Sequence, residues 1–277
     1  MVAQSARAGE PDRHLSALLA PPAVRPHLLA LAAFASELSH VSTAVTREPA
    51  MGEIRLQWWR DALVSSPDNV RTGHPVADAM RAAVRDCRLP HALVLDVIDA
   101  HELELAAHPV ADDAELASYL WKSQGALFAL AAGMLGAQSA ETAHAAASTG
   151  GHAYGLARLL LGFPHALARG RVALPRSRLV AAGVALDELS SGSVDGGRIT
   201  GILADLGAEA RKRLAAARQH VANLPRGLRV AFLPLALVET YLQALERPGR
   251  DVLHVAAEIA PVRRVVRIAA AHWLGRI

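Results

Sequence analysis

The chain has 277 residues, of which 52% are hydrophobic, 20% are charged and 4% are aromatic. This apolar content excludes a largely disordered protein, and the length is sufficient for one large folded core. A single cysteine excludes a secreted scaffold held by intrachain disulfides. The net charge is only +3, and no stripe of basic and aromatic residues is present, so we expect no nucleic-acid partner.

Apolar side chains, mostly alanine and leucine, recur with helical spacing along nearly the whole chain. Residues 1–11 are small and polar, and we expect a flexible N-terminus there, followed by one all-α domain over residues 12–277. The stretch 169–197 predicts a basic turn, a short helix and an exposed loop. The other predicted helices span residues 23–44, 50–64, 72–87, 90–107, 112–136, 140–168, 198–223, 225–246 and 259–274.

The helix predicted over residues 50–64 carries two adjacent tryptophans flanked by charged residues. Neighbouring side chains on a helix point about 100° apart, so both rings can be buried only in thick helical packing. From the residues alone, we favour an ion-paired helix that anchors the fold. The block consists of Glu48, Pro49, Gly52, Glu53, Arg55, Gln57, Trp58, Trp59 and Arg60.

Acidic residues gather on the helix predicted over 90–107 and at the start of the next one. Asp96, Asp99 and Glu102 recur every third residue, so they lie near one helix face, where they could bind a divalent metal or face solvent. We favour a solvated face. Asp112 stands where a helix begins, and we expect it to cap the free backbone N–H groups there.

Residues 168–175 read Ala-Arg-Gly-Arg-Val-Ala-Leu-Pro, which resembles the Arg-Arg-Gly-Arg-Ile-Tyr-Leu-Pro signature of the squalene/phytoene synthase family. The resemblance covers roughly residues 12–277 and includes the Trp-Arg pair at residues 59–60. It implies a single isoprenoid-synthase-like helical domain around a central cavity. Active members of the family join two allylic diphosphates head to head, with Mg²⁺ held by two aspartate-rich helical segments.

Both aspartate-rich segments are missing at the matching positions of this chain. The first would lie near residues 37–45, where the only acidic residue is Glu37. The second would place aspartates at the positions of Gly162 and Ala166, and Arg158 stands where the family has asparagine. Without carboxylates to hold Mg²⁺, the charge of the leaving diphosphate is not neutralised, so we expect no metal site and no cofactor.

Residues 46–63 resemble a subgroup of the family that includes the mitochondrial complex I assembly factor and its bacterial relatives. This resemblance and the missing aspartates together predict a catalytically degenerate binding or assembly factor. Its expected partners are a protein of respiratory complex assembly and an apolar lipid or isoprenoid. The candidate residues for binding a ligand or an anion are Arg158, Arg169, Arg171, Glu37 and Glu104.

The alternative is a prenyltransferase of the same family with a rearranged metal site, which would condense two allylic diphosphates. Mg²⁺ would then be its cofactor, and carboxylates from other helices would replace the missing aspartates. The phosphates would be held directly by Arg158, Arg169 and Arg171. The carboxylates available for such a site are Glu37, Asp99, Glu102 and Glu104.

Two segments bear on membrane contact. Residues 123–140 are uncharged, but their glycines, glutamines and serines favour a buried helix over a membrane span. The C-terminal helix could lie on an anionic bilayer with a basic amphipathic face, or could dock on the bundle with its arginines in water, which we favour. The N-terminus lacks the apolar core of a secretory signal, so we expect a cytoplasmic protein, with peripheral contact with the inner membrane left open. The C-terminal residues concerned are Arg263, Arg264, Arg267 and Trp273.

Overall fold

The computed structural model describes residues 1–44, 49–65, 71–105, 110–136, 141–172, 174–191, 196–247 and 251–277. Within these ranges the chain consists of helices joined by turns and irregular segments, without a strand. The first half contains α1 (Val2–Gly9), α2 (Pro11–Leu18), α3 (Arg25–Ala44), α4 (Pro49–Arg60), α5 (Pro75–Asp86), α6 (His91–Leu105), α7 (Asp113–Leu120) and α8 (Ala126–Met134). The second half contains α9 (Glu141–Ala168), α10 (Arg176–Ala181), α11 (Leu186–Ser191), α12 (Gly196–Ala222), α13 (Arg226–Arg229), α14 (Val238–Leu245) and α15 (Pro261–Leu274).

Helical segments of other types extend or connect these helices. π-helical turns span Asp61–Ser65, directly after α4, and Trp121–Gly125, between α7 and α8. A 3-10 helix, Val230–Leu237, joins α13 to α14. The chain from α7 to α8 is therefore one continuous helical rod with a π turn inside it, a feature often found near functional sites.

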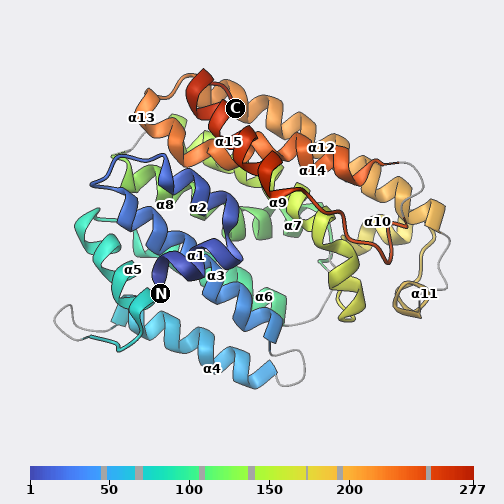
Figure 1. The fold of residues 1–277 in the computed structure, drawn as a ribbon. Coiled ribbons are helices and arrows are strands. Elements are labelled where there is room, and N and C mark those ends of the chain that lie inside the picture. The colour runs from blue at the N-terminus through green and yellow to red at the C-terminus, as the bar shows by residue number, and fades with distance from the viewer. Residues whose placement is uncertain are drawn as a thin grey trace.

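Two long helices organise the bundle. α3 packs against α1, α2, α5 and α6, whereas α9 packs along α12 and against α8 and α14. α8 touches both α3 and α9, so the two groups share one apolar core. Ala32 and Ala33 of α3 and Ala146 and Ala147 of α9 are buried, so small side chains allow close helix packing. In Figure 1, α4 lies at the bottom of the molecule and α12 to α15 lie at the top.

The all-α class predicted from the sequence is confirmed. Each helix predicted between residues 23 and 274 has a counterpart in the structure, with ends that differ by a few residues. The helix predicted over 112–136 is the rod formed by α7, the π turn and α8. The stretch predicted as a basic turn, a short helix and a loop contains two short helices, α10 and α11.

The expectation of a flexible N-terminus over residues 1–11 is wrong. Most of these residues form α1, which packs against α3 with Ala6 fully buried. The small side chains that suggested flexibility instead allow close contact between the helices. A Cβ atom on Gly9 would lie only 2.1 Å from Ser36 Oγ of α3. The N-terminal helix is thus a packed part of the fold.

One helical stretch in the described part of the chain, Arg226–Leu245, is long and apolar enough to cross a membrane. Of its most apolar window, 72% is buried inside the bundle, as for a core helix of a folded domain. The segment 123–140, expected to be a buried helix, is largely buried up to Met134, and residues 137–140 lie outside the described ones.

α9 crosses the π turn of the rod at a pair of glycines. A Cβ atom on Gly151 would lie 2.4 Å from Gly125 Cα and 2.5 Å from its backbone nitrogen. A contact with backbone cannot be relieved by a change of rotamer, so position 151 requires glycine. Gly162 lies on the same helix, but a Cβ atom there would meet nothing within 4 Å.

We predict that Gly151→Ala lowers the free energy of unfolding by about 1–3 kcal/mol, because the added methyl group forces α9 away from the rod. Gly162→Ala is the matched control on the same helix, and it should be neutral or stabilising by up to about 1 kcal/mol, since alanine favours helix. Denaturant-induced unfolding of both variants measures this. Equal stability of the two variants would contradict the close helix crossing.

Candidate ligand-binding site

A cavity of about 400 Å³ lies between α3, α6, the α7–α8 rod and α9. This volume is within the usual range for small-molecule sites. Its apolar lining consists of Ala35, Leu103, Val110, Leu120, Leu127, Leu159, Ala166 and Val172, with Gly155 and Gly162. Its polar lining consists of Glu10, Ser39, His101, Glu104, Glu115, Tyr119, Ser123, Gln124, Arg158 and Arg171. The cavity therefore suits a molecule with an apolar part and a polar group.

Glu104 of α6 is held at the cavity wall by protein partners. Its carboxylate accepts a hydrogen bond from the Tyr119 hydroxyl at 2.6 Å and contacts His101 Nδ1 at 3.1 Å. Burial alone would raise the pKa of Glu104, but His101 and hydrogen bonds from His101, Ser42 and Tyr119 outweigh it and lower the pKa. Burial and the Glu104 carboxylate raise the pKa of Tyr119 well above its usual value. The glutamate is therefore ionised and the tyrosine remains a hydrogen-bond donor.

An ion pair between a buried glutamate and a partly buried arginine forms another part of the cavity wall. Arg158 Nη1 of α9 contacts Glu10 Oε1, just before α2, at 2.5 Å. Arg13 Nε lies 3.4 Å from the other Glu10 oxygen, and its guanidinium lies 4.6 Å from the ring centroid of Phe128. Burial alone would lower the pKa of Arg158, but the Glu10 carboxylate outweighs burial and raises it. Arg158 thus lines the cavity while paired to a carboxylate of the protein.

A second buried carboxylate, Asp12, lies two residues further along the chain. Asp12 Oδ2 accepts hydrogen bonds from the hydroxyls of Tyr154, at 2.7 Å, and Tyr241. Arg264 Nε of α15 contacts Asp12 Oδ1 at 2.7 Å. Asp12 therefore joins the start of α2 to α9, α14 and α15. The expectation that Arg264 faces water or lipid with the other arginines of α15 is wrong, because the rotation of the helix turns it inward.

The candidate residues proposed from the sequence divide into those at the cavity and those away from it. Arg158, Arg171, Gly162 and Ala166 line the cavity. Arg169 is exposed on the turn after α9 and is not part of the lining. The positions that match the second aspartate segment of the family thus face the cavity without a carboxylate. The role of these arginines as ligand contacts stays a prediction.

The carboxylates considered for a rearranged Mg²⁺ site do not converge. Glu37 accepts a hydrogen bond from a serine hydroxyl of α1 at 2.6 Å and does not line the cavity. Asp99 and Glu102, whose helix face we expected to be solvated, contact Arg60 Nη2 at 2.8 and 2.6 Å. Only Glu104 of this set lines the cavity. Across the described ranges, no three His, Cys, Asp or Glu side chains come together as metal ligands. The residues present therefore do not fit a magnesium cluster.

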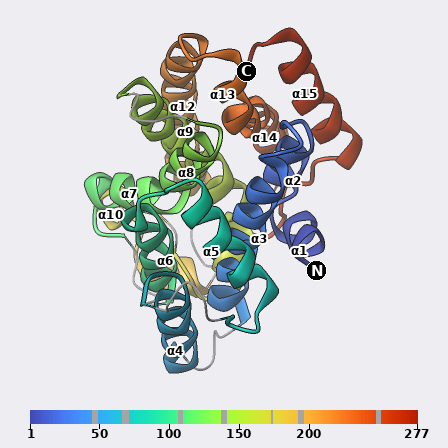
Figure 2. The ribbon, with the colours of Figure 1, turned by 90° about the vertical axis from the view of Figure 1, so that its left-hand side faces the viewer.

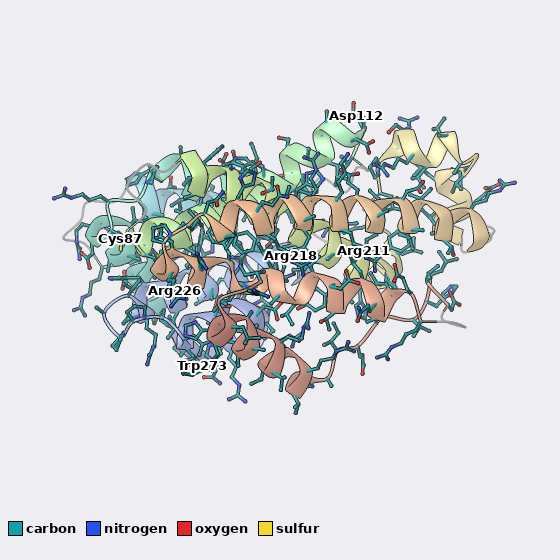
Figure 3. The ribbon with its side chains drawn as sticks, turned by 90° about the horizontal axis from the view of Figure 1, so that it is seen from above. Cys87, Asp112, Arg211, Arg218, Arg226 and Trp273 are labelled. Carbon is teal, nitrogen blue, oxygen red and sulfur yellow. The ribbon has the colours of Figure 1, made fainter. Side chains whose placement is uncertain are left out.

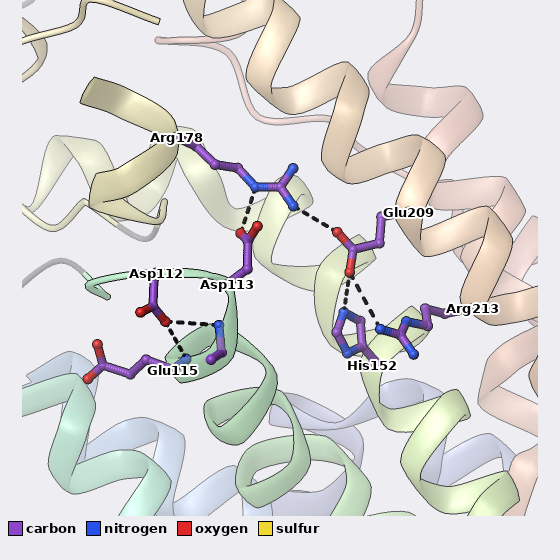
Figure 4. A network of polar contacts seen from close by, with 8 residues as sticks. Asp112, Asp113, Glu115, His152, Arg178, Glu209 and Arg213 are labelled. Carbon is purple, nitrogen blue, oxygen red and sulfur yellow. Dashed lines mark hydrogen bonds and ion pairs between the residues drawn. The ribbon is translucent and has the colours of Figure 1, made fainter. Parts of the chain in front are cut away.

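A polar network fixes the segment after α9, which supplies part of the cavity wall. Arg178 of α10 contacts Asp113 Oδ1 at 2.7 Å and Glu209 Oε2 of α12 at 2.9 Å (Figure 4). Glu209 also contacts His152 Nε2 of α9 at 2.9 Å. Asp112 caps α7 as expected, because its Oδ1 accepts two backbone N–H groups of the first turn at 2.9 Å each. These contacts join α7, α9, α10 and α12.

The tryptophan block forms α4, with one side buried and the other exposed. Trp59 is 4% exposed and packs edge-on against Phe34, with ring centroids 5.3 Å apart. Trp58 remains 39% exposed, so the two rings are not both buried. Arg60 is ion-paired, as expected, and its partners are Asp99 and Glu102 of α6, which the sequence interpretation did not anticipate. Of the remaining members, Gly52 is buried, and the exposed ones are Glu53, Arg55 and Gln57. Glu48 and the side chain of Pro49 lie outside the described part of the chain.

A profile of the squalene/phytoene synthase family matches residues 6–266 of this chain. The chain belongs to the squalene/phytoene synthase family. Within this family it is similar to NADH dehydrogenase (ubiquinone) complex I, assembly factor 6, of Mus musculus, with 28% identity over 88% of this chain and 72% of the relative. The Homo sapiens protein of the same name is 26% identical over the same shares. The resemblance to this subgroup is confirmed.

Solved structures of squalene/phytoene synthase proteins share the fold. A squalene synthase from Alicyclobacillus acidocaldarius has a TM-score of 0.74 at 20% identity, over 90% of this chain and 92% of that chain. A dehydrosqualene synthase in complex with ligand has a TM-score of 0.75 at 13% identity, over 99% of this chain and 95% of that chain. The expected isoprenoid-synthase-like helical fold is therefore confirmed.

Sequence reasoning did not single out Glu10 or Asp12, which hold polar groups at or beside the cavity. Glu10 and Arg158 are 148 residues apart in the chain, so no local spacing reveals the pair. One signal is present in the sequence. Residues 142–186 contain no acidic residue, so an arginine buried there requires a carboxylate from another segment.

We predict that Glu104→Gln lowers the stability at pH 7 by about 1.5–3 kcal/mol, the contribution of a charge-assisted hydrogen bond. The pKa of Glu104 in the folded protein lies below its ordinary value of 4.5. The ionised carboxylate therefore contributes fully to the free energy of unfolding above pH 4.5, and this contribution is lost as the pH falls below 4.5. The difference in the free energy of unfolding between wild type and Glu104→Gln should therefore become smaller below about pH 4.5. Unfolding midpoints measured against pH test this, with Glu53→Gln on the exposed side of α4 as control. A constant difference at all pH values would argue against the lowered pKa.

Proposed function

We propose that this chain is a non-catalytic assembly factor for respiratory complex I, and that its cavity holds an apolar isoprenoid or lipid without converting it. The proposal includes a protein partner in complex assembly. It also includes a cytoplasmic location with peripheral contact with the inner membrane.

The assembly role is supported by the similarity to proteins that are named complex I assembly factors. The similarity to the assembly factors of Mus musculus and Homo sapiens extends over 88% of this chain. The α4 block, which resembles the same subgroup, also presents apolar side chains to the outside, since Ile54 and Trp58 are 63% and 39% exposed. Exposed aromatic and aliphatic residues of this kind suit a protein contact.

The lack of catalysis is supported by the state of the cavity carboxylates, and this observation carries the proposal. Glu10 is paired with Arg158, Glu104 is engaged by a tyrosine and a histidine, and Glu115 accepts a hydrogen bond from the backbone N–H of Ala111. Gly162 and Ala166 offer no carboxylate at the positions of the second aspartate segment. A diphosphate leaves readily only when bound cations neutralise it, and in the described part of the chain no three acidic, histidine or cysteine side chains come together to hold them. The apolar lining remains, so an isoprenoid or lipid tail can still bind.

We predict that the purified protein forms no C30 product from farnesyl diphosphate in the presence of Mg²⁺ and NADPH, the hydride donor that squalene formation requires, because the loss of Lewis-acid assistance costs several powers of ten in rate. Product analysis by mass spectrometry measures this. The squalene synthase of Alicyclobacillus acidocaldarius is the positive control under the same conditions. Turnover by this chain would overturn its assignment as non-catalytic and favour the prenyltransferase alternative.

We predict that deletion of the gene from its source organism lowers the amount of assembled complex I and the NADH:ubiquinone oxidoreductase activity of isolated membranes. The wild-type gene and Gly162→Ala should restore both. Gly162→Leu places a larger side chain in the open space of the cavity and should fail to restore them if a bound ligand is needed. Unchanged complex I in the deletion strain would reject the assembly role, and rescue by Gly162→Leu would reject the ligand.

A further inference from the structure

The buried side of α15 fixes how this helix is rotated. Ile268 and Ala271 are buried, and Arg264 contacts Asp12 from the same side. α15 packs against α2 and the 3-10 helix before α14, and it lies along the outside of the molecule in Figure 2. Its opposite side therefore faces away from the protein.

The opposite side of α15 is apolar. At about 100° per residue, Val262, Val266 and Trp273 lie roughly opposite Arg264. These three residues are 73%, 57% and 80% exposed. Figure 3 shows Trp273 at the edge of the molecule. A surface helix ordinarily turns polar residues outward, so an apolar outward side indicates that another surface covers it.

The charge beside this apolar side is positive. Arg263 and Arg267 lie on one flank of it and are exposed, and Arg276 is exposed just after the helix. Residues 259–277 contain no aspartate or glutamate. Apolar side chains flanked by arginines are complementary to an anionic lipid surface, which takes the apolar groups at the acyl boundary and the cations at the headgroups.

Two comparisons favour lipid over protein as the occupant. α4 also exposes apolar residues, Ile54 and Trp58, but acidic residues lie beside them: Glu53 on α4 and Asp61 just after it. The α4 surface is therefore not predominantly positive, in contrast to the surface of α15. A symmetric contact between two copies of α15 would bring like-charged arginine flanks together. Neither objection applies to an anionic bilayer.

We propose that the outward side of α15 lies flat on an anionic lipid bilayer, an inference that rests on the peripheral membrane contact included in the proposed function. Val262, Val266 and Trp273 enter the interface, and Arg263 and Arg267 contact the headgroups. The contact is peripheral, because only one short helix takes part and its other side is anchored in the bundle. Such a contact is weak, reversible and sensitive to salt.

Vesicle co-sedimentation of the full chain tests the proposal. The protein should bind vesicles of mixed phosphatidylcholine and phosphatidylglycerol, should not bind phosphatidylcholine alone, and should dissociate as salt is added. Replacing both Arg263 and Arg267 by Gln should lower the partition coefficient roughly 30-fold, about fivefold for each arginine near an anionic surface. Replacing Arg55 and Arg85 by Gln is the matched control, since both are exposed on other helices and the net charge changes equally.

Trp273→Phe reports the depth of insertion. The fluorescence of Trp273 is obtained by subtracting the emission spectrum of this variant from that of the wild type. Its maximum should shift to shorter wavelength with anionic vesicles, and brominated lipids should quench it. All of these variants should keep the wild-type Tm, because the replaced side chains are exposed. Equal binding to both vesicle types, or equal losses in the two arginine pairs, would overturn the proposal. So would a dimer in light scattering that Trp273→Phe dissociates.

Discussion

The structure depends on two carboxylates buried at the start of α2. Glu10 and Asp12 are 2% and 3% exposed, and a charge buried this deeply is tolerated only with partners close by. Those partners come from distant parts of the chain, with Arg158 on α9, Tyr241 on α14 and Arg264 on α15. Helices from both ends of the sequence are therefore required to satisfy the same pair of acids. This requirement explains why a short polar segment at the beginning of the chain is ordered.

The same buried charges give the cavity its character. Glu10 and Arg158 are paired with each other and both line the cavity wall. Their charges therefore largely cancel at the place where a ligand would lie. The bundle retains the shape shared with squalene and dehydrosqualene synthases, as the TM-scores of 0.74 and 0.75 indicate. In this chain, helix packing forms the cavity, and a small number of polar side chains determine the charge of its wall.

Most of the fold could be predicted from the sequence, because helix propensity is a local property and the long helices α3, α9 and α12 are rich in alanine and leucine. α1 was missed because its segment is short and consists mostly of small and polar residues, and it packs against α3, a contact that the sequence does not reveal. At the site, family spacing located Gly162, Ala166 and Arg171, which line the cavity. It could not locate Glu10 as the partner of Arg158, since that pairing exists only after the bundle closes.

The ion pair between Arg264 and Asp12 also has an effect on the far side of α15. A helix advances by about 100° per residue, so pinning one side chain to the interior sets the direction of every other side chain on that helix. A shift of a single residue in this anchor would carry Val266 and Trp273 toward a flank and change what the helix offers to its surroundings. A contact in the protein interior thus determines which side chains of α15 are exposed. Mutation of Asp12 is therefore expected to change the outer surface of α15, although Asp12 itself is buried.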